Sequence, residues 1–399
     1  MINLAAAFKI ETCNLSFKLS KAMARFIGIF FLFVMSQHLL LKVTGDPECS
    51  TVGIRGLSGC ECKFFGACDA RGAPKAALNI TQHIPSGLEV FGHSPSGKRN
   101  LVYLCEDSTV AILFDCINRI PIYAATVIKG SQLSGADSGG RPKGVPFHSS
   151  KTGLIQAFQQ TGDDYLWSSK REICYKTRSK KFKKIDYNWY RAKTGSPKRP
   201  LTNYCVGGFD KLKVTIHKGH MIASQYGRGD QSKKKATFVY TNAVPQFGDF
   251  NSVPWQMCES RLIVWGQNNC ARNGAARNVQ MFIVVGVIPS TMFGPSEARY
   301  FGINGFSDYQ DREYRVNVPK KMWTAACCTF EYSDDRGKTW RAGTKNTAFW
   351  RDNVPGKLPC ATLDVSLLTL GVKFRVGPKI NLFPSSDECN NSRNFISLP

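Results

Sequence analysis

Short runs of apolar and β-branched residues, separated by Gly, Pro and Asn, recur along most of this 399-residue chain. They lie at residues 101–104, 111–114, 212–216, 237–240 and 281–288. Runs of this length bounded by turn-forming residues predict strands. Helical patterns are few: one includes Glu259, and another covers residues 364–374 with Asp364 as a cap. The pattern predicts an α+β fold with a twisted antiparallel β core, in which the Gly-rich stretch 130–144 is a loop.

The first 45 residues have the features of a signal peptide. Met23, a candidate initiator, begins a short basic stretch that precedes an apolar run at Phe26–Met35 and small residues ending at Gly45. This run has half of the roughly 20 residues that a membrane-spanning helix needs, so a membrane anchor is the alternative. We therefore expect a secreted, extracellular protein with no stable membrane partner after signal removal.

Cysteine usage agrees with export. Fourteen of the fifteen cysteines follow residue 45, and an even number is typical of disulfide-bonded proteins from oxidising compartments. Residues 46–84 contain four of them without a CxxC pair, which favours a disulfide-tied N-terminal cap over a zinc site. Sequons at Asn79 and Asn390 predict a glycoprotein. The remaining residues, 85–399, are then one large domain with insertions.

The charge of the chain indicates a polyanionic partner. It carries 53 Lys and Arg against 29 Asp and Glu, and twelve of the basic residues lie between Lys170 and Arg199 with only two acidic ones. Five aromatic residues interleave this basic insertion at 170–200. Such a run neutralises phosphates and stacks on bases without reading sequence, which predicts DNA and RNA as partners. Heparin-like polyanions fit the same charge, and a solvated insertion that only aids solubility is the alternative.

Residues 216–262 contain the best candidates for a catalytic site. His220 ends a predicted strand, and a neutral imidazole there can take a proton from water that attacks phosphorus. Mg²⁺ prefers oxygen ligands and keeps several waters, so one asparagine carbonyl and a phosphate oxygen suffice to hold it. His217 and His220 form an HxxH pair, but no nearby cysteine or carboxylate completes a zinc site. Pro254 leaves open whether Asn251 precedes the next helix or lies on it.

This segment resembles the ββα-metal (His-Me finger) motif of the DNA/RNA non-specific endonucleases. That motif reads Asp-Arg-Gly-His, then Thr/Ser-Asn-x-x-Pro-Gln, then Asn-x-x-x-Trp-x-x-x-Glu, and residues 217–220, 241–246 and 251–259 follow it closely. The resemblance covers roughly residues 85–390 and narrows to the secreted endonuclease domain-containing proteins. Its other segments are 101–127, 281–290, 316–328 and 382–389.

The resemblance implies a role for each matched residue. It makes His220 the general base, Asn251 the direct Mg²⁺ ligand, Asn242 an orienting hydrogen-bonder and Glu259 a group acting through metal-bound water. Mn²⁺ is a possible substitute for Mg²⁺. Lys218 would add positive charge at the substrate phosphate. Arg178 or Arg191 would supply the phosphate-clamping arginine that the family places upstream of its histidine.

Three positions depart from the family pattern. His217 replaces Asp, Lys218 replaces Arg, and Ile263 replaces an arginine one turn beyond the glutamate. Arg261 does not substitute for that arginine, because it falls on roughly the opposite side of the helix from Glu259. The sequence predicts a secreted, divalent-metal-dependent endonuclease that hydrolyses DNA and RNA with little sequence preference. The alternative is a catalytically inactive relative that binds nucleic acid or other polyanions.

Overall fold

The structure is a computed structural model that describes most of the chain beyond residue 52. The described residues are 53–69, 72–92, 101–135, 137, 140–151, 159–161, 163–165, 171–175, 210–214, 216–272, 275–293, 300–302, 305–307, 316–333, 337–354, 360–363 and 380–399. The expected signal peptide with Met23, the basic insertion apart from 171–175, Arg178, Arg191 and the helix expected at 364–374 lie outside them.

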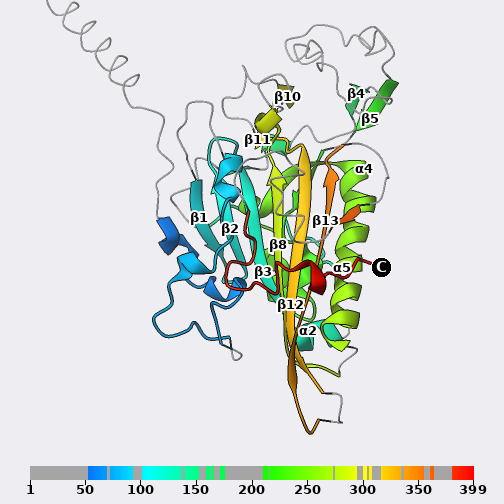
Figure 1. The fold of residues 1–399 in the computed structure, drawn as a ribbon. Helices are drawn as coiled ribbons and strands as arrows, with labels where there is room; N and C mark the ends of the chain where they lie inside the picture. Colours follow the sequence, from blue (N-terminus) through cyan, green and yellow to red (C-terminus); the bar gives the residue numbers. More distant parts are fainter. Residues whose placement is uncertain are drawn as a thin grey trace, which may run out of the picture. The chain divides into compact units, whose positions relative to one another are not determined.

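A seven-stranded antiparallel sheet forms the centre of the fold (Figure 1). Its strands, in spatial order, are β1 (Leu101–Glu106), β2 (Val110–Asp115), β3 (Ile120–Lys129), β8 (Arg277–Ile288), β12 (Lys321–Tyr332), β13 (Arg341–Asp352) and β14 (Ala361–Leu363). Three of the predicted runs lie in β1, β2 and β8. The predicted α+β class with an antiparallel β core is confirmed.

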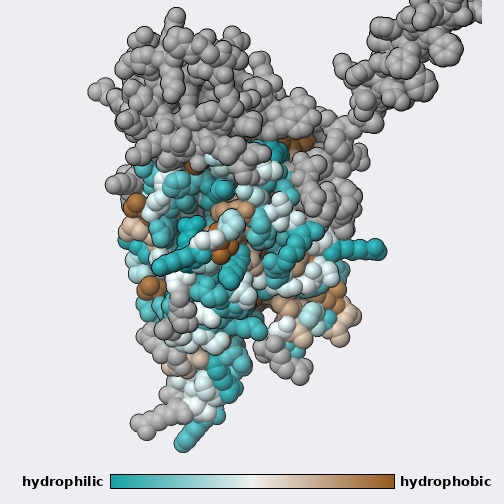
Figure 2. All heavy atoms as spheres, turned by 180° about the vertical axis from the view of Figure 1, so that it is seen from behind, coloured by the Kyte–Doolittle hydropathy of each residue, from teal (hydrophilic) through white to brown (hydrophobic). Residues whose placement is uncertain are grey.

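Both faces of this sheet are buried, because successive side chains of a strand point to opposite faces. In β2, Ile112 packs in one core with Leu262 of the long helix, whereas Leu113 packs in a second core with Leu57 and Leu382 from the two ends of the described chain. The surface seen in Figure 2 is largely hydrophilic where it is described. The central strands therefore read as nearly continuous apolar runs instead of alternating ones.

A ββα unit covers the first of these faces. Strand β6 (Ile216–His220) pairs antiparallel with β7 (Ala243–Phe247), and α5 (Gln256–Asn269) follows. Between β7 and α5 lie α4 (Gly248–Phe250) and one π-helical turn (Asn251–Trp255) that contains Pro254. The ββα-metal arrangement that the sequence predicts is thus present, with Asn251 before α5.

Other short elements connect these layers. They are α2 (Gly130–Ser134), α3 (Gln231–Ala236), β4 (Arg171–Tyr175), β5 (Asp210–Val214), β9 (Tyr300–Gly302), β10 (Gly305–Ser307), β11 (Val316–Asn317), and the 3₁₀ turns η1 (Gly53–Leu57), η2 (Glu61–Lys63), η3 (Ile80–Gln82), η4 (Leu88–Gly92), η6 (Asp163–Tyr165), η9 (Ser224–Gly227), η10 (Tyr240–Asn242), η13 (Ser290–Phe293) and η15 (Ser392–Asn394). No helix in the described part of the chain is long and apolar enough to cross a membrane.

Two local predictions are wrong. The run 237–240 is not a strand: it follows α3, and its Val239 makes only a single parallel bridge to His148. The stretch 130–144 is not wholly a loop, because it begins with α2. The run 212–216 is divided between β5 and β6. In each case tertiary contacts override the local pattern.

Five disulfides link the described residues. They join Cys60 to Cys105, Cys62 to Cys68, Cys258 to Cys360, Cys270 to Cys328 and Cys327 to Cys389. The first ties the N-terminal segment to β1. Cys60, Cys62 and Cys68 are thereby engaged, which contradicts the zinc alternative for this segment.

Protein purified from the medium of eukaryotic cells is expected to show few or no free thiols in a denaturing titration. Reduction should lower its stability strongly, because Cys258–Cys360 alone spans 102 residues of sequence and a loop of that size is worth about 4–5 kcal/mol of unfolded-state entropy. Urea unfolding with and without dithiothreitol measures the loss. A secreted protein with mostly free thiols would contradict the disulfide assignment.

Candidate active site

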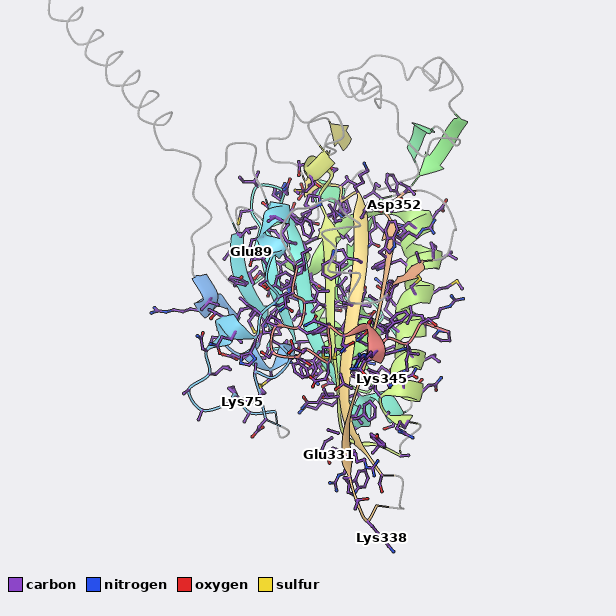
Figure 3. All side chains as sticks on the ribbon, viewed as in Figure 1. Lys75, Glu89, Glu331, Lys338, Lys345 and Asp352 are labelled. Atoms are coloured by element: carbon purple, nitrogen blue, oxygen red, sulfur yellow. A yellow bond between two sulfur atoms is a disulfide. The ribbon has the colours of Figure 1, made fainter. Side chains whose placement is uncertain are left out.

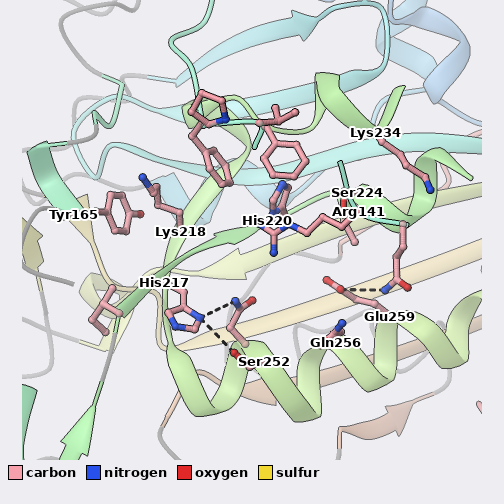
Figure 4. Close-up of a pocket in the computed structure, with 18 of the residues that line it drawn as sticks. Arg141, Tyr165, His217, Lys218, His220, Ser224, Lys234, Ser252, Gln256 and Glu259 are labelled. Carbon is pink, nitrogen blue, oxygen red and sulfur yellow. Dashed lines mark hydrogen bonds between the residues drawn. The ribbon is translucent and has the colours of Figure 1, made fainter. Parts of the chain in front are cut away.

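A cavity of about 710 Å³ is lined by residues of β6, η9, the beginning of α5 and the segment that precedes β4 (Figure 4). The sequence-predicted residues His220, Lys218, Asn251 and Glu259 all line it. Asn242 does not. Four side chains that are as many as 41 residues apart in the chain therefore converge on one space, as the family motif requires.

His220 ends β6 with its imidazole between two aromatic rings. The ring centroids of Phe147 and Phe238 lie 4.8 and 4.6 Å from its own. Its Nε2 is buried and has no hydrogen-bond partner among the described residues. Burial, with a smaller contribution from the Arg141 charge, lowers the pKa of His220 to about 3. The imidazole is therefore neutral at pH 7, and its orphaned nitrogen is suited to a ligand that the site would bind.

Asn242 fixes the backbone directly after His220. Its Oδ1 accepts from the Ile222 amide at 2.9 Å, and its Nδ2 donates to the carbonyl oxygens of Ile222 and Thr237 at 3.0 and 2.9 Å. The backbone carbonyl oxygen of Asn242 accepts a hydrogen bond from the Met221 amide at 2.8 Å. Asn242 is completely buried. Its contacts suit the orienting role that the sequence implies and keep it away from the reacting atoms.

Asn251 begins the π-helical turn. Its side chain contacts His217, one of the three residues that differ from the family motif. The Nδ2 of Asn251 lies 3.2 Å from Nδ1 of His217, to which it donates when that imidazole is neutral. Burial and the Arg141 charge lower the pKa of His217, while Asp249 raises it, and the net shift is downward. The side-chain carbonyl oxygen of Asn251, Oδ1, makes no hydrogen bond to a described residue. This oxygen is the group that a hard cation would take.

Glu259 is buried in the first turn of α5, opposite η9. Gln225 donates from Nε2 to its Oε2 at 3.3 Å (Figure 4). Burial raises the pKa of Glu259 to about 8, and the hydrogen bond from Gln225 offsets this only in part. The carboxyl thus keeps its proton at neutral pH unless a cation stabilises the ionised form. Cys258, the preceding residue, is bonded to Cys360.

Lys218 is enclosed by aromatic rings. Its Nζ lies 5.6 Å from the ring centroids of Tyr165 and Tyr240 and 5.8 Å from that of Phe147. These are cation–π distances. Burial lowers the pKa of Lys218. The lysine that replaces the family's arginine is therefore held in a fixed place at the edge of the cavity.

Arg141 is a cavity residue that the sequence interpretation missed. Its guanidinium carbon lies 5.2 Å from the Phe238 ring, and its charge reaches both His217 and His220. The buried Lys234 binds Asp137 at 2.6 Å and Gly140 at 3.4 Å, which holds the segment that carries Arg141. The only sequence signal was a lone arginine in the Gly-rich stretch upstream of the histidine.

The donors present fit a magnesium-type ion better than zinc. The described part of the chain contains no group of three His, Cys, Asp or Glu that could hold a metal. A hard cation with one amide oxygen, several waters and a substrate phosphate needs no such group. The free carbonyl of Asn251 and the buried Glu259 supply the oxygen atoms for that arrangement.

A family model and solved structures match the chain. A family model described as DNA/RNA non-specific endonuclease matches residues 97–385. Among solved structures, the chain is similar to one in "Crystal structure of the EndoG/EndoGI complex: Mechanism of EndoG inhibition", at 14% identity and a TM-score of 0.39, covering 72% of this chain and 86% of that one. No curated protein matches the chain.

Proposed function

Because the chain belongs to the DNA/RNA non-specific endonuclease family, we propose that it is a divalent-metal-dependent enzyme that hydrolyses DNA and RNA with little sequence preference. The observation that carries this proposal is the convergence of His220, Asn251 and Glu259 on one cavity beside a ββα unit. Phosphate contacts alone carry no sequence information, and the cations of this cavity are suited to such contacts.

His220 acts as the general base. Its neutral imidazole accepts a proton from the water that attacks phosphorus, and no prior deprotonation is needed at pH 7. A pKa of about 3 belongs to the substrate-free site, where burial disfavours the imidazolium and Arg141 adds a smaller repulsion. A phosphate paired with Arg141 would cancel that smaller repulsion and raise the basicity of His220 in part.

Asn251 would hold Mg²⁺, or Mn²⁺ in its place, through its carbonyl oxygen, and Glu259 would contact bound water. The ion would neutralise charge on the phosphate and on the departing oxygen. His217 keeps the amide of Asn251 turned so that the nitrogen faces the imidazole and the oxygen stays available. An aspartate at position 217 would accept the same hydrogen bond, so His217→Asp should change an active enzyme only modestly.

Arg141 and Lys218 are the cations that would hold the scissile phosphate. Both line the cavity, and both stand against aromatic rings that limit their movement. Arg141 therefore takes the role for which Arg178 or Arg191 was predicted. Those two residues lie outside the described part of the chain, and phosphate binding by the insertion stays a prediction.

We also propose an extracellular location. The five disulfides require an oxidising compartment for their formation. Of the two sequons, Asn79 is exposed and caps η3. Asn390 uses its amide nitrogen in hydrogen bonds to Asn381, Phe383 and Ser386, so Asn79 is the position suited to a glycan.

The direct test is cleavage of plasmid DNA and of single-stranded RNA with Mg²⁺, with Mn²⁺ and with EDTA. We expect cleavage of both polymers that requires the metal. Asn251→Ala should raise the metal concentration for half-maximal rate by at least about tenfold, since it removes the direct ligand while the base remains. Asn268→Ala, which replaces an exposed asparagine near the end of α5, serves as the matched control and should leave the requirement unchanged.

The alternative function is binding of polyanions without catalysis. His217, Lys218 and Ile263, which is buried in α5, are the departures that favour it. Absence of cleavage with either metal across neutral and alkaline pH, together with retained DNA binding, would replace the enzyme by this alternative. Activity gained by His217→Asp in an otherwise silent protein would support it further.

A further inference from the structure

Lys218, which the proposed function places at the scissile phosphate, has no polar contact that would orient its ammonium. It forms no ion pair or hydrogen bond with a residue that the structure describes. A lysine charge sits on a flexible four-carbon stem, so an ammonium without such partners is free to move. The rings of Phe147, Tyr165 and Tyr240 around its Nζ are therefore the contacts that fix its position.

Tyr165 reaches Lys218 from a different element than the other two rings. Phe147 and Tyr240 contact each other, with ring centroids 5.8 Å apart. Tyr165 instead ends η6, a 3₁₀ turn of three residues, and lies buried beside Lys218 (Figure 4). A turn this short has little stability of its own, so contacts from outside it must hold the Tyr165 ring in place.

A buried ion pair anchors η6. Nη1 and Nη2 of Arg119 donate to Oδ1 and Oδ2 of Asp164 at 3.1 and 2.9 Å, and Nη2 also donates to the Gln159 carbonyl oxygen at 2.7 Å. The side chains of Arg119 and Asp164 are only 12% and 8% exposed. Two parallel charge-assisted hydrogen bonds fix the orientation of a pair as well as its separation. The residue before Tyr165 is thus fastened to the turn between β2 and β3.

The backbone of Arg119 supports a specific role for its side chain. Its φ is 56°, in the left-handed region that glycine adopts easily and arginine adopts rarely. A turn between two strands could be formed at this position by glycine with less strain. The use of arginine here points to the bonds that its guanidinium makes with Asp164 and Gln159.

Gln160 connects Tyr165 to the strand that pairs with the catalytic histidine's strand. Its Oε1 accepts from the Tyr165 hydroxyl at 2.5 Å, and its Nε2 donates to the carbonyl oxygens of Arg119 and Ala243 at 2.9 and 2.6 Å. Ala243 is the register partner of His220 in the β6–β7 ladder. Gln160 is completely buried. One amide therefore holds both the ring beside the Lys218 ammonium and the strand opposite the base.

We propose that Tyr165 is a positioning residue that holds the Lys218 ammonium at the phosphate-binding edge of the cavity, and that the Arg119–Asp164 pair sets the place of its ring. The effect on catalysis rests on the proposed function, whereas the hold of the ring on Lys218 does not. Both Tyr165 and Arg119 lie outside the motif at residues 217–259, which carries the other candidate residues.

NMR of the reductively ¹³C-methylated protein tests the contact without any cleavage. Methyl groups on a lysine that faces aromatic rings are shifted upfield by the ring currents, and Lys218→Arg identifies the Lys218 signal by its loss. Tyr165→Leu should move this signal toward the position of exposed lysines, whereas Tyr165→Phe, which keeps the ring, should leave it shifted. An unmoved signal in Tyr165→Leu would overturn the proposal, whether or not the protein is a nuclease.

The rate of DNA cleavage should follow the same order. Tyr165→Leu is expected to lower kcat by about 10–100-fold, because a displacement of about 1 Å at a reacting centre has an effect of this size. Tyr165→Phe should stay close to the wild type. In a Lys218→Ala background, Tyr165→Leu should cause little further loss, since Tyr165 acts through Lys218. An equal fold-loss in both backgrounds would show that Tyr165 supports the site only generally.

Arg119→Lys tests the anchor from outside the cavity and serves where Tyr165→Leu does not fold. It keeps the charge but loses the paired bonds to Asp164, so it should move the Lys218 signal in the same direction and lower kcat less. It too should have little effect in the Lys218→Ala background.

Arg277→Lys is the matched control. Arg277 forms an ion pair with Glu331 at 2.6 Å, at the lower end of β12 in Figure 3, and does not line the catalytic cavity. The control should change neither the Lys218 signal nor kcat. A shift equal to that of Arg119→Lys would overturn the role of the anchor. The expected order of signals in a protein that does not cleave would contradict only the proposed function.

Discussion

Replacement of His220 by alanine is expected to lower kcat by about 10²–10⁴-fold, the usual contribution of a positioned general base. Nucleic-acid binding should remain, because the base acts mainly in the transition state. The imidazole packs between Phe147 and Phe238, so its removal leaves a slot that small molecules can enter. Free imidazole should therefore restore part of the rate. Single-turnover kinetics with and without added imidazole measure both effects.

The control for this experiment is Asn242→Ala, which alters the position of the backbone after His220 and leaves the imidazole itself in place. It removes the side-chain hydrogen bonds that hold Ile222 and Thr237, so it should reduce both thermal stability and kcat and gain nothing from imidazole. A His220→Ala enzyme that loses less than tenfold would place the base elsewhere.

Metal-free protein is expected to become less stable between about pH 6.5 and 8, by about 2 kcal/mol. The cause is Glu259, whose pKa rises from 4.5 to about 8 on folding. Within this window the folded protein holds a proton that the unfolded chain has released, so a rise in pH favours unfolding. Mg²⁺ should reduce the decline, because a cation near Glu259 stabilises the carboxylate.

His220 has the opposite effect at lower pH. Its pKa falls from 6.5 to about 3 on folding, so stability is lost as pH decreases below 6.5. Between about pH 4.5 and 6.5 the two groups oppose one another, and above 6.5 the contribution of His220 is small.

Urea unfolding in EDTA at the two ends of the window measures this effect. Glu259→Gln should remove the decline, since glutamine fills the same space without a titrating proton. An equal decline in Glu259→Gln would assign the pH dependence to another group, such as Glu106, whose pKa burial also raises.

The sequence around His220 and Pro254 was sufficient to predict the local backbone there. The alternation before His220 places it at a strand end, and Pro254 indicates irregular backbone before α5, where the structure has a π-helical turn. The β-branched run 237–240 failed as a predictor because its backbone caps α3 and forms a turn that Asn242 completes. The hydrogen bond from Asn242 to the Thr237 carbonyl, five residues away in the sequence, outweighed the strand propensity of this run.

Of the two cations of the site, Lys218 follows from the motif, whereas Arg141 could not be predicted from spacing. Arg141 reaches the cavity because Lys234, almost a hundred residues later, binds Asp137 and Gly140. Sequence motifs record residues that neighbour each other along the chain, whereas this contact depends on the approach of α3 to the segment that follows α2.

The bond between Cys258 and Cys360 has a consequence for the cell that makes the protein. It joins the turn that carries Glu259 to the residue preceding β14, at the edge of the sheet. Glutathione keeps cytosolic thiols reduced, so a chain that remained in the cytosol would lack the Cys258–Cys360 disulfide. Under the proposed extracellular nuclease function, correct placement of the turn would be tied to export from the cytosol, which contains the producer's own RNA. This one covalent bond would then limit digestion of that RNA during synthesis.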